Sequence, residues 1–192
     1  MCHSPSPGVP EHWRSERLVF RAFAATEASI ARGIFNAGAH LRDRDPTFGE
    51  YDLQEFEQLI DRDQTHVQRN GEPRFYLRAI IDANDNSVVG YVQIEIDAPE
   101  QGHSWIPMLV LKPSDQGRGI GREVARSIAF QLEALGIVDV GLNVYAENPA
   151  AVRFWFRCGF REILDVELEE QHGKNYTCLT LRRKLIRSGE YV

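Results

Sequence analysis

The chain has 192 residues, a length that fits one domain of ordinary size. Lys and Arg number 22 against 28 Asp and Glu, which gives a formal net charge of −6, and 43% of the residues are hydrophobic. This composition excludes a disordered chain. The acidic balance argues against a nucleic-acid partner, because nucleic-acid-binding proteins usually present a basic face.

Three cysteines, Cys2, Cys158 and Cys178, show no CxxC spacing. We therefore expect neither a disulfide framework nor a metal site, and a reducing cytoplasm is the simplest setting. The longest strongly apolar run, 106–111, is far shorter than a membrane span of ~18 residues, so we expect no membrane association. The proline-rich beginning lacks the apolar stretch of a signal peptide.

The first part of the chain predicts one strand and two helices. Alternating apolar residues over 18–22 indicate a strand, and Thr26 is expected to cap a first helix. The pattern at 52–55 resembles a capping box that opens a second helix, ending near 70–71. The charged segment 38–50 between the helices is predicted to be a loop.

The middle of the chain predicts three strands, over 75–81, 88–96 and 106–111. The third is apolar on both faces and is therefore expected to be central in the sheet. Pro107 has no N–H to donate, so it predicts a bulge or a position that is not hydrogen-bonded.

The second half predicts, in chain order, a helix after the turn 117–121, a strand over 138–145, a short helix capped by Asn148, and two closing strands over 161–169 and 175–185. The whole order predicts a flexible N-terminal tail over 1–14, one domain over 15–187, and a C-terminal tail over 188–192.

The segment 109–122 carries the clearest chemical signal, because it places a buried strand, a glycine-rich turn and a helix start in succession. N–H groups at a helix N-terminus favour anions, and Gly117, Gly119 and Gly121 let that backbone approach a phosphate without side-chain clash. On this segment alone, a plain glycine-rich turn is the alternative interpretation.

Two familiar phosphate motifs do not fit this turn. A P-loop requires Lys followed by Ser or Thr, which is missing. The dinucleotide fingerprint GxGxxG fails in both frames, since Arg122 or Val124 stands where its last glycine is required. The pattern Gln-x-x-Gly-x-Gly does fit, at 116–121.

This turn and a second motif together resemble the GNAT N-acetyltransferases. The segment 116–121 is similar to that family's loop for the acetyl-CoA pyrophosphate. The run 148–151, then Trp155, then 159–160 matches its Asn-x-x-Ala-x-x-x-Tyr-x-x-x-Gly-Phe pattern with one change. The opening segment 15–23 resembles the branch that includes ribosomal-protein N-acetyltransferases.

The resemblance implies an α+β GNAT fold, a single domain with a splayed mixed central β-sheet flanked by helices. Strands ending near Leu111 and Val144 would diverge and leave a cleft for acetyl-CoA. An N–H near Leu109 or Val110 would polarise the thioester carbonyl. The implied cofactor-binding residues are Leu109, Val110, Leu111, Gln116, Gly117, Arg118, Gly119, Ile120, Gly121, Arg122, Asn148, Ala151 and Trp155.

The implied reaction is direct attack of a neutral primary amine on the thioester. Family members commonly use a Tyr at the position of Trp155 to protonate the departing thiolate, whereas an indole N–H can only donate a hydrogen bond. Either the thiolate is stabilised without protonation, or Tyr145 is the catalytic acid. Tyr145 also fits a partly buried aromatic.

The general base is less well defined by the sequence. The Glu often found on the strand before the phosphate loop appears here as Ile106. Glu95 on the neighbouring strand is our catalytic candidate, with Asp97 behind it and His103 as a further base. Glu95 also fits a solvated strand face.

The expected acceptor is a small-molecule amine or a peptide N-terminus, with acetyl-CoA as cosubstrate and no metal. The family's acceptor site is shaped by the loop at 38–50, which contains His40 and a mixture of charges. The alternative function is a catalytically silent acyl-CoA-binding or regulatory protein, and a homodimer is left open.

Overall fold

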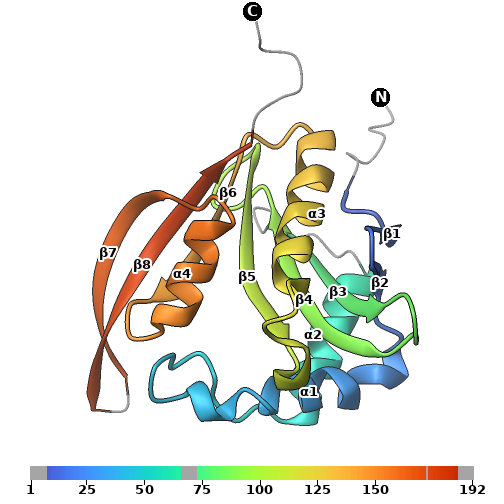
Figure 1. Cartoon of the computed structure of the whole chain (residues 1–192), viewed down its shortest axis with the longest axis horizontal. Coiled ribbons are helices and arrows are strands. Elements are labelled where there is room, and N and C mark those ends of the chain that lie inside the picture. Colours follow the sequence, from blue (N-terminus) through green and yellow to red (C-terminus); the bar gives the residue numbers. More distant parts are fainter. Residues whose placement is uncertain (1–7, 66–72, 172, 186–192) are drawn as a thin grey trace, which may run out of the picture.

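A computed structural model of the protein describes residues 8–65, 73–171 and 173–185. One eight-stranded sheet has the order β1-β2-β3-β4-β5-β6-β8-β7 (Figure 1). The strands are β1 (His12–Arg14), β2 (Leu18–Ala22), β3 (Arg74–Asp82), β4 (Val88–Ile96), β5 (His103–Leu111), β6 (Asp139–Tyr145), β7 (Glu162–Gln171) and β8 (Lys174–Lys184). Neighbours pair antiparallel except β5 and β6, which are parallel, so the predicted mixed sheet is confirmed.

Helices cover both faces of this sheet (Figure 1). They are α1 (Ala28–Asn36), α2 (Leu53–Thr65), α3 (Ile120–Ala134) and α4 (Pro149–Arg157), with short 3-10 turns at Ala25–Glu27, Ala39–Leu41 and Pro113–Asp115. One apolar cluster packs α1 and α2 against one face, and a second packs α3 and α4 against the other. No helix among the described residues is long and apolar enough to cross a membrane.

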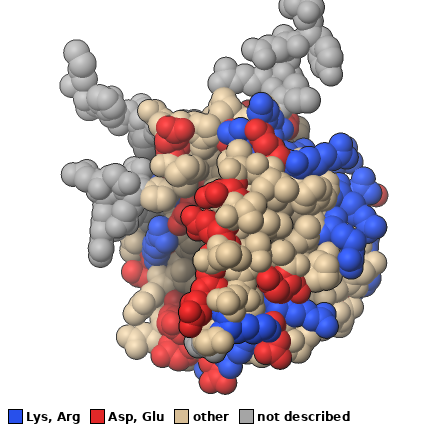
Figure 2. All heavy atoms as spheres, turned by 90° about the vertical axis from the view of Figure 1, so that its left-hand side faces the viewer, with Lys and Arg blue, Asp and Glu red and all other residues tan. Residues whose placement is uncertain are grey.

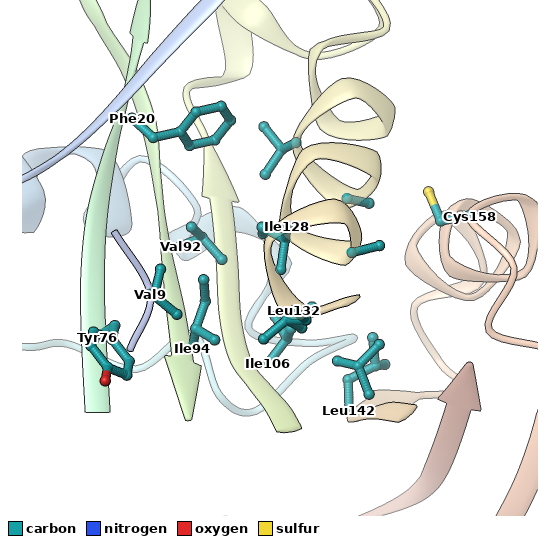
Figure 3. Packing of buried hydrophobic residues seen from close by; sticks show 14 of the residues in the cluster. Val9, Phe20, Tyr76, Val92, Ile94, Ile106, Ile128, Leu132, Leu142 and Cys158 are labelled. Atoms are coloured by element: carbon teal, nitrogen blue, oxygen red, sulfur yellow. The ribbon is translucent and has the colours of Figure 1, made fainter. Parts of the chain in front are cut away.

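The packing of α3 follows from its predicted apolar stripe. Ile128 and Leu132 are buried and project from α3 toward Ile94 and Ile106 of the sheet (Figure 3). Burying one such aliphatic side chain contributes about 1.5–3 kcal/mol. The stripe therefore fixes which face of α3 meets the sheet. With that face fixed, the first turn of α3 lies close to the end of β5.

Local signals predicted the start of α2 correctly and the start of α1 incorrectly. The Asp52 N–H donates to Glu55 Oε2 at 2.7 Å and the Glu55 N–H donates to Asp52 Oδ1 at 3.0 Å, which is the predicted capping box. Thr26 caps nothing, because it lies inside a 3-10 turn and α1 begins at Ala28. The predicted end of the second helix at 70–71 lies outside the described residues.

The bulge predicted from Pro107 is confirmed. Gln93 of β4 pairs with Met108 of β5, and Glu95 pairs with Trp105, so one residue of β4 faces two residues of β5. A bulge at this point bends the strand and tolerates the missing N–H of proline.

The predicted tail over 1–14 is wrong for its described part. Strand β1 pairs with β2, and the Trp13 ring stacks on Phe20 with centroids 4.6 Å apart. The Trp13 indole N–H donates to Ser127 Oγ at 2.8 Å, and Val9 is buried. A strand of three residues is too short to show an alternating pattern, so β1 could not be recognised from the residues alone. Residues 1–7 and the predicted tail 188–192 lie outside the described residues.

A buried ion pair anchors this N-terminal segment and α2 to the sheet. Arg78 of β3 is fully buried and its Nη1 donates to both carboxylate oxygens of Asp63 of α2, at 2.8 and 2.7 Å. Its Nε donates to the Pro10 carbonyl at 3.0 Å. One guanidinium therefore joins three segments far apart in the sequence.

We predict that Asp63→Asn lowers the free energy of unfolding by about 3–5 kcal/mol, because it leaves the buried Arg78 charge without its counter-ion. Urea denaturation measures this loss. Glu162→Gln is the matched control, since it breaks an exposed pair with Arg182 and should cost less than about 1 kcal/mol. Equal losses in the two variants would show that the Arg78 pair does not anchor the fold.

Candidate active site

The site begins where β5 and β6 stop pairing. Their parallel ladder contains three residue pairs, the last between Trp105 and Gly141. Strand β5 then continues to Leu111 and β6 to Tyr145 with no further pairing between them, and Figure 1 shows the two strands separating. The predicted divergence is confirmed, and the side of β5 that faces β6 has no strand partner over 106–111 among the described residues.

The packing at the last pair explains where the separation begins. A Cβ added at Gly141 would lie 2.3 Å from the Trp105 ring, so the indole occupies the space beside β6 where a side chain would stand. At the closed end of the pair, His103 Nδ1 lies 2.7 Å from Asp139 Oδ1, and Asp139 Oδ2 lies 3.6 Å from Arg182. His103 is therefore engaged in a charged cluster at the end opposite the opening.

The glycine-rich turn leads from β5 into α3. Gly117 and Gly119 have φ values of 74° and 80°, a left-handed conformation that favours glycine. Gly119 is the N-cap of α3 and supplies no side-chain cap, so the first N–H groups of α3 have no side-chain acceptor within the described part of the chain. Such N–H groups at a helix start bind anions.

Gly121 has a packing role that the sequence analysis did not predict. A Cβ at this position would lie 3.0 Å from the Phe154 ring of α4. The sequence interpretation assigned all three glycines to the approach of a phosphate. The missing side chain of Gly121 also permits α3 and α4 to pack closely, which leaves the predicted role of its main chain untouched.

Two predicted ligand side chains in this turn are already engaged. The Gln116 side-chain amide donates to the Leu111 carbonyl at 3.1 Å. The Arg118 guanidinium bonds to Asp115 at 2.7 Å and lies 4.0 Å from Asp82. The Arg118 side chain is therefore turned toward the β3–β4 turn.

Glu123 ties the start of α3 to the turn before β2, and the sequence analysis did not single it out. Its carboxylate accepts hydrogen bonds from Ser15 Oγ at 2.6 Å and from the N–H and Nε of Arg17 at 2.7 and 2.8 Å. Burial alone raises the pKa of Glu123, but these hydrogen bonds outweigh it and hold that pKa below its usual value. Arg17 thereby offsets a negative charge beside the glycine turn.

The second motif forms the helix α4 as predicted. The Asn148 side chain accepts from the Ala151 N–H at 3.2 Å and caps the helix, and its Nδ2 lies 3.5 Å from Asp45. Trp155 is buried, with its ring against Phe154 and Phe160. The indole thus belongs to the core between α4 and the sheet.

Tyr145, at the open end of β6, projects to the face opposite α4. Its hydroxyl donates to Glu169 of β7 at 2.9 Å, and Gln171 donates to the same carboxylate at 2.8 Å. Burial and the Glu169 charge raise the pKa of Tyr145, while the Tyr145 hydrogen bond lowers the pKa of Glu169. The phenol keeps its proton at neutral pH, beside an ionised carboxylate.

The charged loop 38–50 lies against this end of β6 and β8. Lys174 donates to the Asp43 carbonyl, and the Tyr176 hydroxyl donates to the Arg42 carbonyl at 3.4 Å. His40 lies 3.1 Å from the Ala37 carbonyl and is exposed. The loop is therefore fixed to β8, the strand that pairs with β6 beside Tyr145.

Glu95 lies on the same face of the sheet as Tyr145 but at a different position along the strands. It projects toward α2, where Arg62 lies 3.3 Å away and stacks on Phe75. Glu95 pairs with Trp105 at the point of separation, whereas Tyr145 lies four residues beyond Gly141, ~13 Å along the strand. The structure does not bring these two predicted catalytic residues together.

A family model described as the Acetyltransferase (GNAT) family matches residues 38–160. The chain belongs to this family. The predicted GNAT fold is thus confirmed, and the chain is an acetyl-CoA-dependent N-acetyltransferase. For this GNAT protein the sequence analysis named the glycine turn, α4 and the charged loop that contains Asp45, but it missed Glu123 and Glu169. Glu169 does not stand out in its segment, because acidic and apolar residues alternate there as they do in a solvated strand.

Relatives of this GNAT chain include polyamine acetyltransferases. It is 26% identical over 145 residues to spermidine N(1)-acetyltransferase of Vibrio cholerae serotype O1, covering 74% of this chain and 79% of that one. A Vibrio cholerae spermidine N-acetyltransferase solved with CoA and spermine has a similar fold, with a TM-score of 0.71, 19% identity, and coverage of 89% and 97%. A Vibrio cholerae chain proposed to be a ribosomal-protein-serine acetyltransferase has a TM-score of 0.67, 20% identity, and coverage of 90% and 97%.

We predict that Gly119→Glu weakens acetyl-CoA binding by about 100-fold or more relative to Gly119→Ala. Both variants strain the left-handed backbone, but only the glutamate places a negative charge at the start of α3, where like charges about 4 Å apart repel by about 4 kcal/mol. Isothermal titration calorimetry measures the two affinities. Equal affinities would remove this turn from the phosphate site.

Proposed function

We propose that this GNAT protein transfers the acetyl group of acetyl-CoA to a primary amine of a small, multiply charged cationic acceptor. The observation that carries the proposal is that the opening between β5 and β6 has two different sides. The glycine turn and the start of α3 lie on the α3–α4 side, whereas Tyr145 and Glu169 project on the other. The cofactor and the acceptor would therefore approach from opposite faces.

In this proposal the pantetheine arm pairs with the free edge of β5 as an added strand. The main chain of Leu109, Val110 and Leu111 supplies its partners, since β6 does not pair with these residues. The pyrophosphate is held by N–H groups of 116–122. An N–H near Leu109 or Val110 donates to the thioester carbonyl, where a donor of this kind contributes roughly 10²–10³ in rate.

The acetyl transfer requires a neutral amine and a leaving thiolate. The amine nitrogen bonds to the thioester carbon, the carbon–sulfur bond breaks, one proton leaves the nitrogen, and one proton reaches the sulfur. Trp155 cannot supply that proton because an indole does not act as an acid and the ring is buried. Tyr145 is the proposed donor to the sulfur. Glu95, once released from Arg62, is the proposed base, and because it lies ~13 Å along the strand from Tyr145 it acts through a chain of water molecules.

Charge near the proposed acceptor side favours a cation. Glu169 is ionised beside Tyr145, and Asp45 lies near enough to raise the pKa of that phenol further. Acidic side chains of β7 form part of the band of Asp and Glu on the side of the molecule seen in Figure 2. Together with the spermidine acetyltransferase relative, this charge supports a polyamine over a peptide N-terminus as acceptor.

Release of free thiol from acetyl-CoA tests this function. We expect turnover with spermidine or spermine at least about tenfold faster than with a neutral peptide N-terminus, because a second ammonium group meets a carboxylate. Thiol is titrated with a disulfide reagent, and acetylated products are identified by mass spectrometry. Binding of acetyl-CoA without thiol release from any amine would instead establish the silent acyl-CoA-binding alternative.

We predict that Tyr145→Phe lowers kcat about 100-fold and leaves the affinity for acetyl-CoA unchanged, because general acids contribute about 10²–10⁴ to a rate. Tyr176→Phe is the matched control, since that ring packs against Tyr145 and its hydroxyl contacts only a main-chain carbonyl among the described groups. Equal rates in the two variants would exclude Tyr145 as the acid.

The same assay applied to Glu95→Gln tests the base. A 100-fold lower kcat and loss of the acidic limb of the pH–rate profile are expected. A normal profile would exclude Glu95 and make positioning of an already neutral amine the source of the rate.

A further inference from the structure

An open basin on the α3–α4 side of the molecule is lined mainly by arginines. Its volume is about 620 Å³, and it extends from the turn before β2 across α3 to the end of α4 and β8. Its arginines are Arg17, Arg122, Arg126, Arg157 and Arg183. Its acidic residues are Glu16 and Glu123. A protein with a net charge of −6 thus concentrates positive charge at one place.

Four of these five guanidinium groups have no carboxylate partner among the described residues. Arg17 forms an ion pair with Glu123, and Arg183 donates a hydrogen bond to the Cys158 carbonyl at the end of α4. Arg122, Arg126 and Arg157 are exposed and form no ion pair with the described residues. Like charges gathered without counter-ions repel one another, so an anion bound among them would be favoured.

The basin continues directly from the glycine turn. Gly119 both caps α3 and lines the basin. Arg122 and Arg126 are four residues apart and therefore lie on one face of α3, ~6 Å along its axis. Arg157 reaches the basin from the last turn of α4. A ligand with one phosphate at the glycine turn would carry a second phosphate toward Arg126 and Arg157.

We propose that Arg126 and Arg157 bind the 3′-phosphate of the CoA ribose and make the enzyme select CoA over dephospho-CoA. The inference rests on the proposed function, which puts the pyrophosphate at the glycine turn. A phosphate monoester carries about −1.5 to −2 charges and accepts paired N–H bonds from guanidinium groups. The pyrophosphate has its own main-chain donors, so the unpaired arginines suit the second phosphate.

Calorimetric titration of the full chain with CoA and with dephospho-CoA tests the selection. The unmodified protein should bind CoA at least about tenfold more tightly, because hydrogen bonds to charged groups stabilise more than neutral ones. Arg126→Gln and Arg157→Gln should each weaken CoA about tenfold and leave dephospho-CoA unchanged. Arg153→Gln is the matched control, since Arg153 is exposed on α4, the helix that carries Arg157, and does not line the basin.

The two ligands separate the failure of this proposal from failure of the proposed function. Equal affinities of the unmodified protein for CoA and dephospho-CoA would overturn the 3′-phosphate site while leaving the cofactor cleft in place. Equal weakening of both ligands by Arg126→Gln or Arg157→Gln would overturn it as well, because it would indicate a general electrostatic effect. Binding of neither ligand would overturn the proposed function itself.

A phosphorus-31 spectrum of bound CoA gives a second, direct readout. The 3′-phosphate resonance should titrate at lower pH when bound than when free, because cations favour the dianion. That displacement should disappear in Arg126→Gln and persist in Arg153→Gln. An unshifted 3′-phosphate titration in the unmodified protein would contradict the site.

Discussion

The short ladder between β5 and β6 is the constraint on which the site depends. Main-chain groups of a central strand normally pair on both sides, yet β5 is paired to β6 only as far as Trp105. The indole lies where a side chain at Gly141 would stand, and the bulge at Pro107 then bends β5 at the next positions. The strand therefore presents a free edge in the middle of a sheet, where solvent or an extended ligand must satisfy it.

Around this opening the fold separates two charge environments. On one side, the helix start beside Gly119 and the arginines of the basin favour phosphate. On the other, Glu169 and Asp45 surround Tyr145 and favour a cation. Attraction of the two reactants to opposite faces would reduce competition between a strongly anionic cofactor and a cationic acceptor for the same surface. Arg17 contributes by offsetting the charge of Glu123 at the start of α3.

Trp155 stands where the GNAT motif has a tyrosine, and this difference links the packing of α4 to the proposed chemistry. A buried indole contributes a large apolar area to the core between α4 and the sheet. It gives no proton to a leaving group, which transfers that proposed role to the phenol of Tyr145 on the opposite face of the sheet. The raised pKa of Tyr145 holds its proton at neutral pH, so the group is a hydrogen-bond donor before it is an acid.

The sequence by itself determined those features whose cause lies within a few residues. The capping box at 52–55, the bulge at Pro107 and the cap by Asn148 each follow from one local hydrogen bond or its absence. The tertiary structure alone decided the features that join distant segments. It packed Gly121 against Phe154, paired residues such as Glu95 and Arg62, and gathered the arginines of the basin from three elements and one turn, because local patterns carry no information about which distant side chains will meet.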